Sequence, residues 1–170
     1  MSNHKNVNEI YNDAMYEFLN NRFEKSIEIL SQAVELDPGR KLFFVSRGSA
    51  YLQLNQLEKA LQDFNNAIEI DPEYARAFHL RGLVEEKRGA DDRALENFSR
   101  AIEIDPEYGA AYHSRATLHT KMGREDLALQ DIAMVQHLTN KNIETFANEN
   151  NVWRSQHTRL ESIMESELGR

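Results

Sequence analysis

Three arginines that recur at a fixed spacing are the first residues in the sequence with an obvious chemistry: Arg47, Arg81 and Arg115. A row of guanidinium groups could bind an anion such as a phosphate or a carboxylate. Sixteen residues after each arginine stands a side chain that can accept a hydrogen bond from it: Asp63, Asn97 and Asp131. Because a partly buried charge normally has a partner, we favour internal pairing of each arginine over an anion-binding row.

Two histidines, His79 and His113, are separated by the same interval as neighbouring arginines, and His119 lies nearby in the sequence. Imidazoles on neighbouring elements could ligate a metal or respond to pH. The chain has no cysteine, and no group of carboxylates accompanies the histidines. Equivalent positions on packed helices lie about 10 Å apart, which is too far for two imidazoles to share an ion. We expect no metal and no cofactor.

The sequence contains none of the short motifs that mark common catalytic sites. It lacks the phosphate-binding loop, the dinucleotide-binding glycines, the zinc-protease pattern and the nucleophile elbow of hydrolases. No set of residues combines an acid, a base and a nucleophile at a recognisable spacing. We therefore expect a protein that is not an enzyme.

Composition restricts the class of partner. The formal net charge is −8 and no basic stripe is present, so we expect no nucleic-acid binding. No apolar run approaches the roughly 20 residues that a membrane span needs, and the first residues do not follow the pattern of a signal peptide. The expected location is the cytoplasm.

The interval between the arginines recurs through most of the chain as a repeat period. The stretch "AIEIDPEYARAFHLRG" at 67–82 is nearly repeated as "AIEIDPEYGAAYHSRA" at 101–116. Other positions separated by one period keep one class of residue. Bulky side chains recur at Ile10, Phe44, Phe78, Tyr112 and Phe146, small ones at Ala14, Gly48, Gly82 and Ala116, turn formers at Asn21, Asn55, Gly89 and Gly123, and Asp-Pro pairs at Pro38, Pro72 and Pro106.

Each set of positions has a structural reason. Apolar residues follow helical spacing in two stretches per period. The Asn or Gly between the stretches can adopt a left-handed backbone that ends the first helix, and Asp-Pro ends the second. The predicted helices are 7–20, 23–36, 41–54, 57–70, 75–88, 91–104, 109–122 and 125–138, with one more from 141 to about 166. A helical hairpin cannot cover its own apolar face, so successive hairpins are expected to stack.

With this repeat period and two helical stretches per period, the chain resembles the tetratricopeptide repeat family, whose unit is a helix–turn–helix of about 34 residues. Residues 43–72 and 78–106 match the family pattern closely, 109–138 lose the closing proline, and 7–38 match more loosely. The resemblance implies an all-α fold, a right-handed α-solenoid of four helical hairpins. It specifies the fold rather than the chemistry, because the family shares a scaffold.

The expected organisation has three parts. Residues 1–6 form a flexible N-terminus. Four repeats occupy 7–140, divided as 7–40, 41–74, 75–108 and 109–140. Residues 141–170 form a long C-terminal capping helix and tail, since a repeat array needs an end element with a polar outer side. Trp153 and the apolar stripe of this helix could instead pair with a second copy, which would make the protein a self-assembling scaffold.

The resemblance implies that the first helices of the hairpins line a concave groove that holds a peptide or helix of a partner protein. We therefore expect a non-catalytic adapter, with an apolar early groove and a more polar and basic later groove. Helical geometry selects the partner-binding residues, which are Tyr11, Asn12, Met15, Leu42, Val45, Ser46, Ser49, Arg76, His79, Leu80, Leu83, Lys87, His113, Thr117 and Lys121.

Chaperone-docking members of the family provide one specific comparison. They grip the terminal carboxylate of a peptide with lysine, arginine and asparagine side chains from three consecutive first helices. The aligned positions here hold Tyr11, Met15, Ser46, Arg76 and Leu80, of which only Arg76 is cationic. Because such a grip needs a set of cationic donors, we do not expect this chain to hold a chaperone tail.

Overall fold

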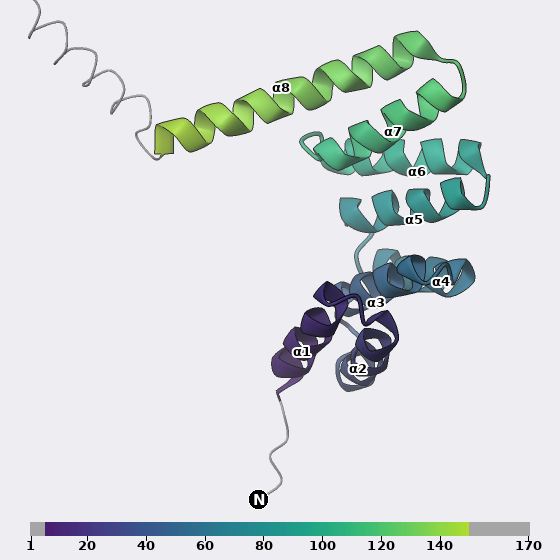
Figure 1. Ribbon diagram of the computed structural model, residues 1–170, viewed down its shortest axis with the longest axis vertical. Coiled ribbons are helices and arrows are strands. Elements are labelled where there is room, and N and C mark those ends of the chain that lie inside the picture. Colours follow the sequence, from purple (N-terminus) through teal and green to yellow (C-terminus); the bar gives the residue numbers. More distant parts are fainter. Residues whose placement is uncertain (1–5, 150–170) are drawn as a thin grey trace, which may run out of the picture.

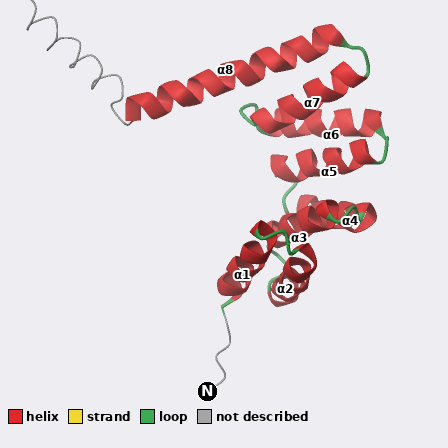
Figure 2. Cartoon of the chain, viewed as in Figure 1, coloured by secondary structure: helices red, strands yellow, loops and turns green. Residues whose placement is uncertain are grey.

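The computed structural model describes residues 6–149, and this part of the chain consists of α-helices joined by short turns, without a β-strand (Figure 1, Figure 2). The helices pair in chain order into four hairpins. Their bounds are α1 Val7–Leu19, α2 Phe23–Leu36, α3 Lys41–Gln53, α4 Leu57–Ile70, α5 Ala75–Lys87, α6 Asp91–Ile104, α7 Gly109–Lys121 and α8 Glu125–Glu149. The predicted all-α class is confirmed.

The turn inside each hairpin has the predicted left-handed backbone. The φ angle is 58° at Asn21, 56° at Asn55, 76° at Gly89 and 71° at Gly123. Glycine adopts this conformation without steric cost, and asparagine tolerates it better than other side chains. The turn formers that recur once per repeat therefore act as the sequence predicted.

The turn between hairpins is set by the aspartates that precede the prolines. Asp37, Asp71 and Asp105 are the C-caps of α2, α4 and α6. Each donates its backbone N–H to the carbonyl of the alanine four residues earlier, at 3.0 Å. The proline that follows has no N–H to continue this ladder, so each second helix ends there.

The hairpins stack in sequence order, as predicted, because each second helix packs on the first helix of the next hairpin. The first helices also approach one another, α1 with α3, α3 with α5 and α5 with α7. No comparable approach joins the second helices of the described residues. A stack whose first helices are closer than its second helices curves with the first helices on its inner side.

The core lies between successive hairpins. Phe64 of α4 is fully buried in one cluster with Val45 of α3 and with Ala77 and Val84 of α5. Phe98 of α6 repeats this arrangement in a cluster that includes Leu118 of α7. Burying a side chain of this size stabilises the fold by about 2–3 kcal/mol, which couples each hairpin to the next.

The prediction of a separate helix from residue 141 is wrong within the described residues. α8 runs without a break from Glu125 to Glu149, through the predicted end at residue 138. The sequence there has neither an Asp-Pro pair nor a turn residue with positive φ, so nothing stops the helix. Trp153 and the rest of the expected capping segment beyond Glu149 lie outside the described residues.

Candidate functional site

The predicted binding residues lie on α1, α3, α5 and α7, and their surface is called here the first-helix face. The structure divides them by exposure. Asn12, Arg76, Lys87, His113, Thr117 and Lys121 are exposed, Tyr11, Met15, Leu42, Ser49, Leu80 and Leu83 are half-buried, and Val45, Ser46 and His79 are buried. The exposed and half-buried members stay a prediction of where a partner would bind.

The prediction that Val45 binds a partner is wrong. Its side chain is fully buried in the core cluster with Phe64 and Val84, so it presents no surface to a partner. The sequence assigned it to the first-helix face because helical spacing places it beside Leu42 and Ser49. α3 is covered from several sides, and the four consecutive residues 43–46 are all buried. A helix that is buried nearly all round has no single outward face to predict.

Ser46 joins two first helices instead of projecting from the surface. The Tyr11 hydroxyl of α1 lies 3.2 Å from the Ser46 hydroxyl of α3. The Tyr11 ring packs at 5.4 Å, centroid to centroid, from the ring of Phe43. Both contacts fix the angle between the first two hairpins, so a partner would meet the outer edge of Tyr11 and not Ser46.

His79 plays the same role between the third and fourth hairpins. Its Nδ1 lies 3.1 Å from the Tyr108 hydroxyl and its Nε2 lies 2.9 Å from Oγ of Ser114. Burial, with a smaller contribution from the charge of Arg76, lowers the pKa of His79 to about 4. The imidazole is therefore neutral at pH 7, and both nitrogens are engaged. Burial also raises the pKa of Tyr108.

The surface around these junctions is mixed in character. Leu80 and Leu83 pack their inner edges on the core cluster and keep part of each side chain exposed. Arg76 and Lys87 of the same helix are exposed, and Lys121 of α7 forms an ion pair with Asp91 at 2.8 Å. Apolar area beside cationic groups suits an amphipathic segment that carries acidic residues.

The arginine pairs are confirmed on the other side of the first helices. Arg47 donates from Nε and Nη2 to the two carboxylate oxygens of Asp63, at 2.9 and 2.8 Å. Arg115 binds Asp131 in the same way, at 2.8 and 2.7 Å. Arg81 donates from Nε to Oδ1 of Asn97 at 2.7 Å. Each arginine thus links the two helices of its own hairpin.

A second set of partners was missed from the sequence. Nη1 of each arginine also donates to a residue sixteen positions earlier, on the second helix of the preceding hairpin. These acceptors are Ser31, Asn65 and Ser99. They too recur once per repeat, and this regular spacing was the signal that could have found them. One side chain per repeat therefore ties three helices together.

Neither a metal site nor a membrane-spanning helix is found in the part of the chain that the structure describes. No group of three histidine, aspartate or glutamate side chains in residues 6–149 is placed to hold a metal ion. Within the same range, no helix has the length and apolarity to cross a membrane.

Two models of one repeat family match the chain. One, described as "TPR repeat", matches residues 48–89, and the other, described as "Tetratricopeptide repeat", matches residues 75–108. The second match coincides with the third predicted repeat. No sequence among the curated proteins matches the chain.

Solved structures share the architecture over most of the chain. The crystal structure of MamA aligns with a TM-score of 0.74 and 24% identity, covering 84% of this chain and 84% of that one. A MamA structure from Desulfovibrio magneticus RS-1 aligns with a TM-score of 0.70 and 17% identity, covering 80% and 77% of the two chains.

A third structure is the first TPR of Spaghetti (RPAP3) bound to the HSP90 peptide SRMEEVD. It aligns with a TM-score of 0.65 and 19% identity, covering 69% of this chain and 93% of that one. At these identities the alignments show a common fold. With the matching repeats, the left-handed turns and the stacked hairpins, they lead to one conclusion: the chain is a tetratricopeptide repeat protein.

Proposed function

We propose that the protein is a non-catalytic interaction scaffold whose four hairpins, residues 7–140, bind a segment of a partner protein on the first-helix face. The observation that carries the proposal is the continuity of this face. The first helices approach one another along the stack, so the side chains of α1, α3, α5 and α7 form one inner surface. Half-buried leucines provide apolar area there without completing a core.

The chemistry of this face favours an amphipathic peptide or helix. Leu42, Leu80 and Leu83 would take apolar side chains, and Arg76 and Lys87 would attract acidic ones. Affinity for such a segment is typically micromolar, about 8 kcal/mol. The RPAP3 domain supports peptide capture by this fold, since its structure contains a bound peptide. The chain lacks the cationic set that grips a chaperone tail, so we propose a different partner.

The test begins with selection of binding peptides from a random displayed library, followed by calorimetry. Arg76→Glu on the first-helix face should weaken binding of a selected peptide about tenfold or more, because it reverses a charge at the contact. Lys59→Glu is the matched control, since it makes the same change of charge on the exposed surface of α4. Equal affinities of the two variants would remove the first-helix face from consideration.

A second function is favoured by one observation on α8. Several large apolar side chains of this helix are exposed: Leu127, Leu129, Ile132 and Ile143. Ile132 stands one period after Phe98, which is fully buried, yet Ile132 is 41% exposed because no described hairpin follows α8. This uncovered end could pair with a second copy and produce a self-assembling scaffold.

Light scattering separates the two functions. If α8 mediates assembly, the full chain should form a dimer or larger species, whereas Leu129→Glu with Ile132→Glu should be monomeric. A version ending at Asn142 tests the contribution of the residues beyond it. A monomer for the full chain at high concentration would dispose of self-assembly and leave the peptide-binding function intact.

A further inference from the structure

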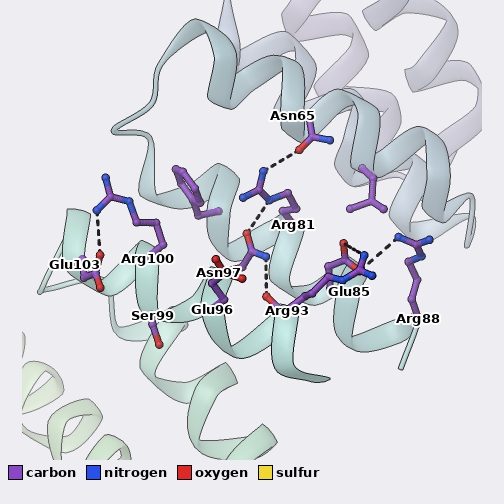
Figure 3. A pocket seen from close by; sticks show the side chains of 12 residues that line it. Asn65, Arg81, Glu85, Arg88, Arg93, Glu96, Asn97, Ser99, Arg100 and Glu103 are labelled. Carbon is purple, nitrogen blue, oxygen red and sulfur yellow. Dashed lines mark hydrogen bonds and ion pairs between the residues drawn. The ribbon is translucent and has the colours of Figure 1, made fainter. Parts of the chain in front are cut away.

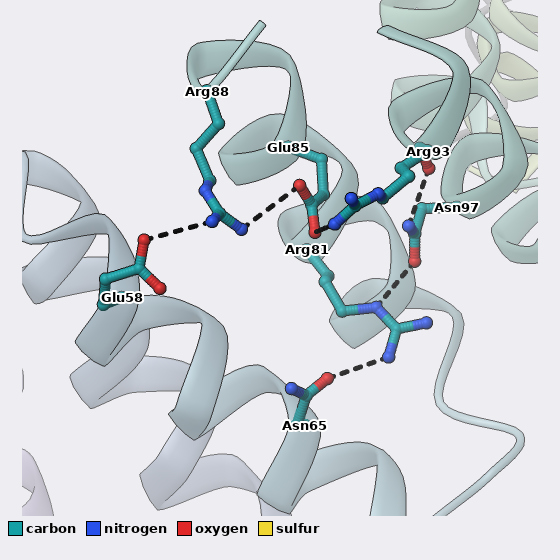
Figure 4. A network of polar contacts seen from close by, with 7 residues as sticks. All are labelled: Glu58, Asn65, Arg81, Glu85, Arg88, Arg93 and Asn97. Carbon is teal, nitrogen blue, oxygen red and sulfur yellow. Dashed lines mark hydrogen bonds and ion pairs between the residues drawn. The ribbon is translucent and has the colours of Figure 1, made fainter. Parts of the chain in front are cut away.

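The arginine of the third hairpin differs from its two counterparts. Arg47 and Arg115 each face an aspartate, which supplies a negative charge and two hydrogen bonds. At the equivalent place Arg81 faces Asn97, which accepts a single bond at 2.7 Å. Its other partner is Asn65, at 2.9 Å, which is also neutral (Figure 4). Arg81 is thus the repeat arginine whose hydrogen-bond acceptors are both uncharged.

Because Asn97 stands where the other hairpins have an aspartate, some N–H donors of Arg81 are left without an acceptor. A guanidinium has five N–H donors, and Arg81 uses one on Nε and one on Nη1. Nη2, which binds a carboxylate oxygen in the other two arginines, has no hydrogen-bond acceptor within residues 6–149. Figure 4 draws this nitrogen without a dashed line. The aspartates hold the pKa of Arg47 and of Arg115 above its ordinary value, whereas burial lowers the pKa of Arg81.

Arg81 borders a pocket of about 750 Å³ that opens between α4, α5 and α6 (Figure 3). Because the second helices α4 and α6 do not approach one another, the space between them is not filled by helix packing. The lining includes Asn65, Phe78, Asn97 and Arg100. The pocket lies on the second-helix side and is separate from the first-helix face.

The other charges of the pocket limit what can enter. Arg88 and Arg93 lie 3.5 and 3.9 Å from the carboxylate of Glu85, and Arg100 lies 3.0 Å from that of Glu103. Arg88 also lies 3.2 Å from the carboxylate of Glu58, so each of these three cations has a carboxylate within 4 Å, whereas Arg81 has none among the described residues. Glu85 and Glu96 both line the pocket, and their charges act on Arg81 from a distance. Several carboxylates would repel a doubly charged phosphate more than a singly charged group.

We propose that this pocket binds a carboxylate group, which pairs with the free N–H donors of Arg81 and supplies the negative charge that an aspartate supplies in the neighbouring hairpins. The shared chemistry is a monoanionic carboxylate, either an acidic side chain of a polypeptide or a small organic acid. The site is independent of peptide capture on the first-helix face.

The variant Asn97→Asp provides the sharpest test. It restores the aspartate that the other hairpins have, so it should fold and should occupy Arg81 internally. Sodium acetate is titrated at constant ionic strength while NMR follows the Nε–H signal of Arg81. The wild type should show a saturable shift, and Asn97→Asp should bind acetate about tenfold more weakly or not at all, because a charge-assisted hydrogen bond is lost.

Arg88→Gln is the matched control, since it removes one positive charge from the same pocket and leaves the donors of Arg81 in place. It should keep acetate binding within about threefold of the wild type. The tripeptide Ac-Ala-Glu-Ala-amide tests whether the carboxylate comes from a polypeptide side chain or from a small organic acid. Binding about tenfold tighter than acetate assigns a polypeptide side chain, and equal binding assigns a small organic acid.

Three results would overturn the proposal. Sodium chloride could produce the same shift as acetate, which would reduce the effect to ionic strength. Asn97→Asp could bind acetate as the wild type does, which would place the anion away from Arg81. Inorganic phosphate could bind more tightly than acetate at matched ionic strength, which would replace the carboxylate with a different anion.

Discussion

Gly82 of α5 faces the ring of Phe98 of α6 so closely that a Cβ on the glycine would stand 2.5 Å from Cε1 and 2.7 Å from Cδ1 of the ring. One period earlier Gly48 faces Phe64, with the corresponding distances 2.7 and 3.0 Å. The missing side chain lets the two helices of a hairpin approach until the phenylalanine fills the space. The pairing of a small and a bulky residue in these successive repeats is therefore a steric requirement.

Gly82→Ala should destabilise the protein. An alanine in a helix is normally favoured over glycine by about 1 kcal/mol. Here the clash with Phe98 costs about 1–3 kcal/mol, because the ring is fully buried and its surroundings cannot relax freely. The urea midpoint should fall. Gly109→Ala is the matched control, since its Cβ would meet nothing closer than 3.8 Å and should leave the midpoint unchanged or raise it. A midpoint for Gly82→Ala that rises as it does for Gly109→Ala would contradict the steric argument.

Gly89→Ala should destabilise for a different reason. The φ angle of Gly89 is 76° and no atom lies within 4 Å of a Cβ built there, so only the backbone conformation opposes a side chain. The expected cost is about 1 kcal/mol for alanine and less for asparagine, which the chain itself uses at the equivalent Asn55. Urea unfolding of Gly89→Ala and Gly89→Asn measures which variant loses more stability. Equal losses would show that the left-handed turn does not distinguish the two side chains.

These positions show what a single sequence can predict. Turn residues and small–large pairs act locally, so a regular repeat period exposes them. The pairing of Arg47 with Asp63 was predictable because both residues belong to one hairpin. The burial of Val45 was not predictable, because it depends on the helices of three hairpins that cover α3 together. The continuation of α8 was missed because the repeat pattern suggested a boundary that no stop signal enforces.

Asp63→Ala should be strongly destabilising. The side chain of Asp63 is 3% exposed and that of Arg47 is 18% exposed, and the hydrogen bonds that Arg47 donates to Asp63 raise the pKa of Arg47, so the guanidinium stays charged. Removing the carboxylate leaves this charge with a neutral acceptor, Ser31, and no anionic partner, at a cost of about 2–5 kcal/mol in unfolding free energy. Equilibrium denaturation measures it.

The double variant Arg47→Met with Asp63→Leu is the control for this pair. It removes both charges and keeps apolar volume, so its stability should recover to within about 1 kcal/mol of the wild type. If the double variant were as unstable as Asp63→Ala, the loss would come from packing and not from an unpaired charge.

Acid should weaken the junction between the third and fourth hairpins through His79. Burial holds the pKa of this imidazole at about 4, below the ordinary value of 6.5. Between these pH values the unfolded chain binds a proton that the folded chain does not, so stability falls as pH decreases from about 6.5 to 4. At pH 4 the loss of unfolding free energy that His79 causes is about 3 kcal/mol. A charged imidazole would donate from both nitrogens, so the hydroxyls of Tyr108 and Ser114 would both have to accept, and the one that donates to the neutral ring would have to turn its O–H elsewhere.

The variant His79→Gln isolates this contribution, because glutamine can still donate and accept but does not titrate in this range. Unfolding free energies of the two proteins are compared at several pH values between 7 and 4. Carboxylates that titrate in the same interval are common to both proteins and cancel in the difference. The wild type should lose more stability than the variant on acidification, and NMR should find the His79 resonances unchanged down to about pH 5. Parallel pH profiles would mean that the imidazole accepts its proton in the folded protein as readily as in the unfolded chain.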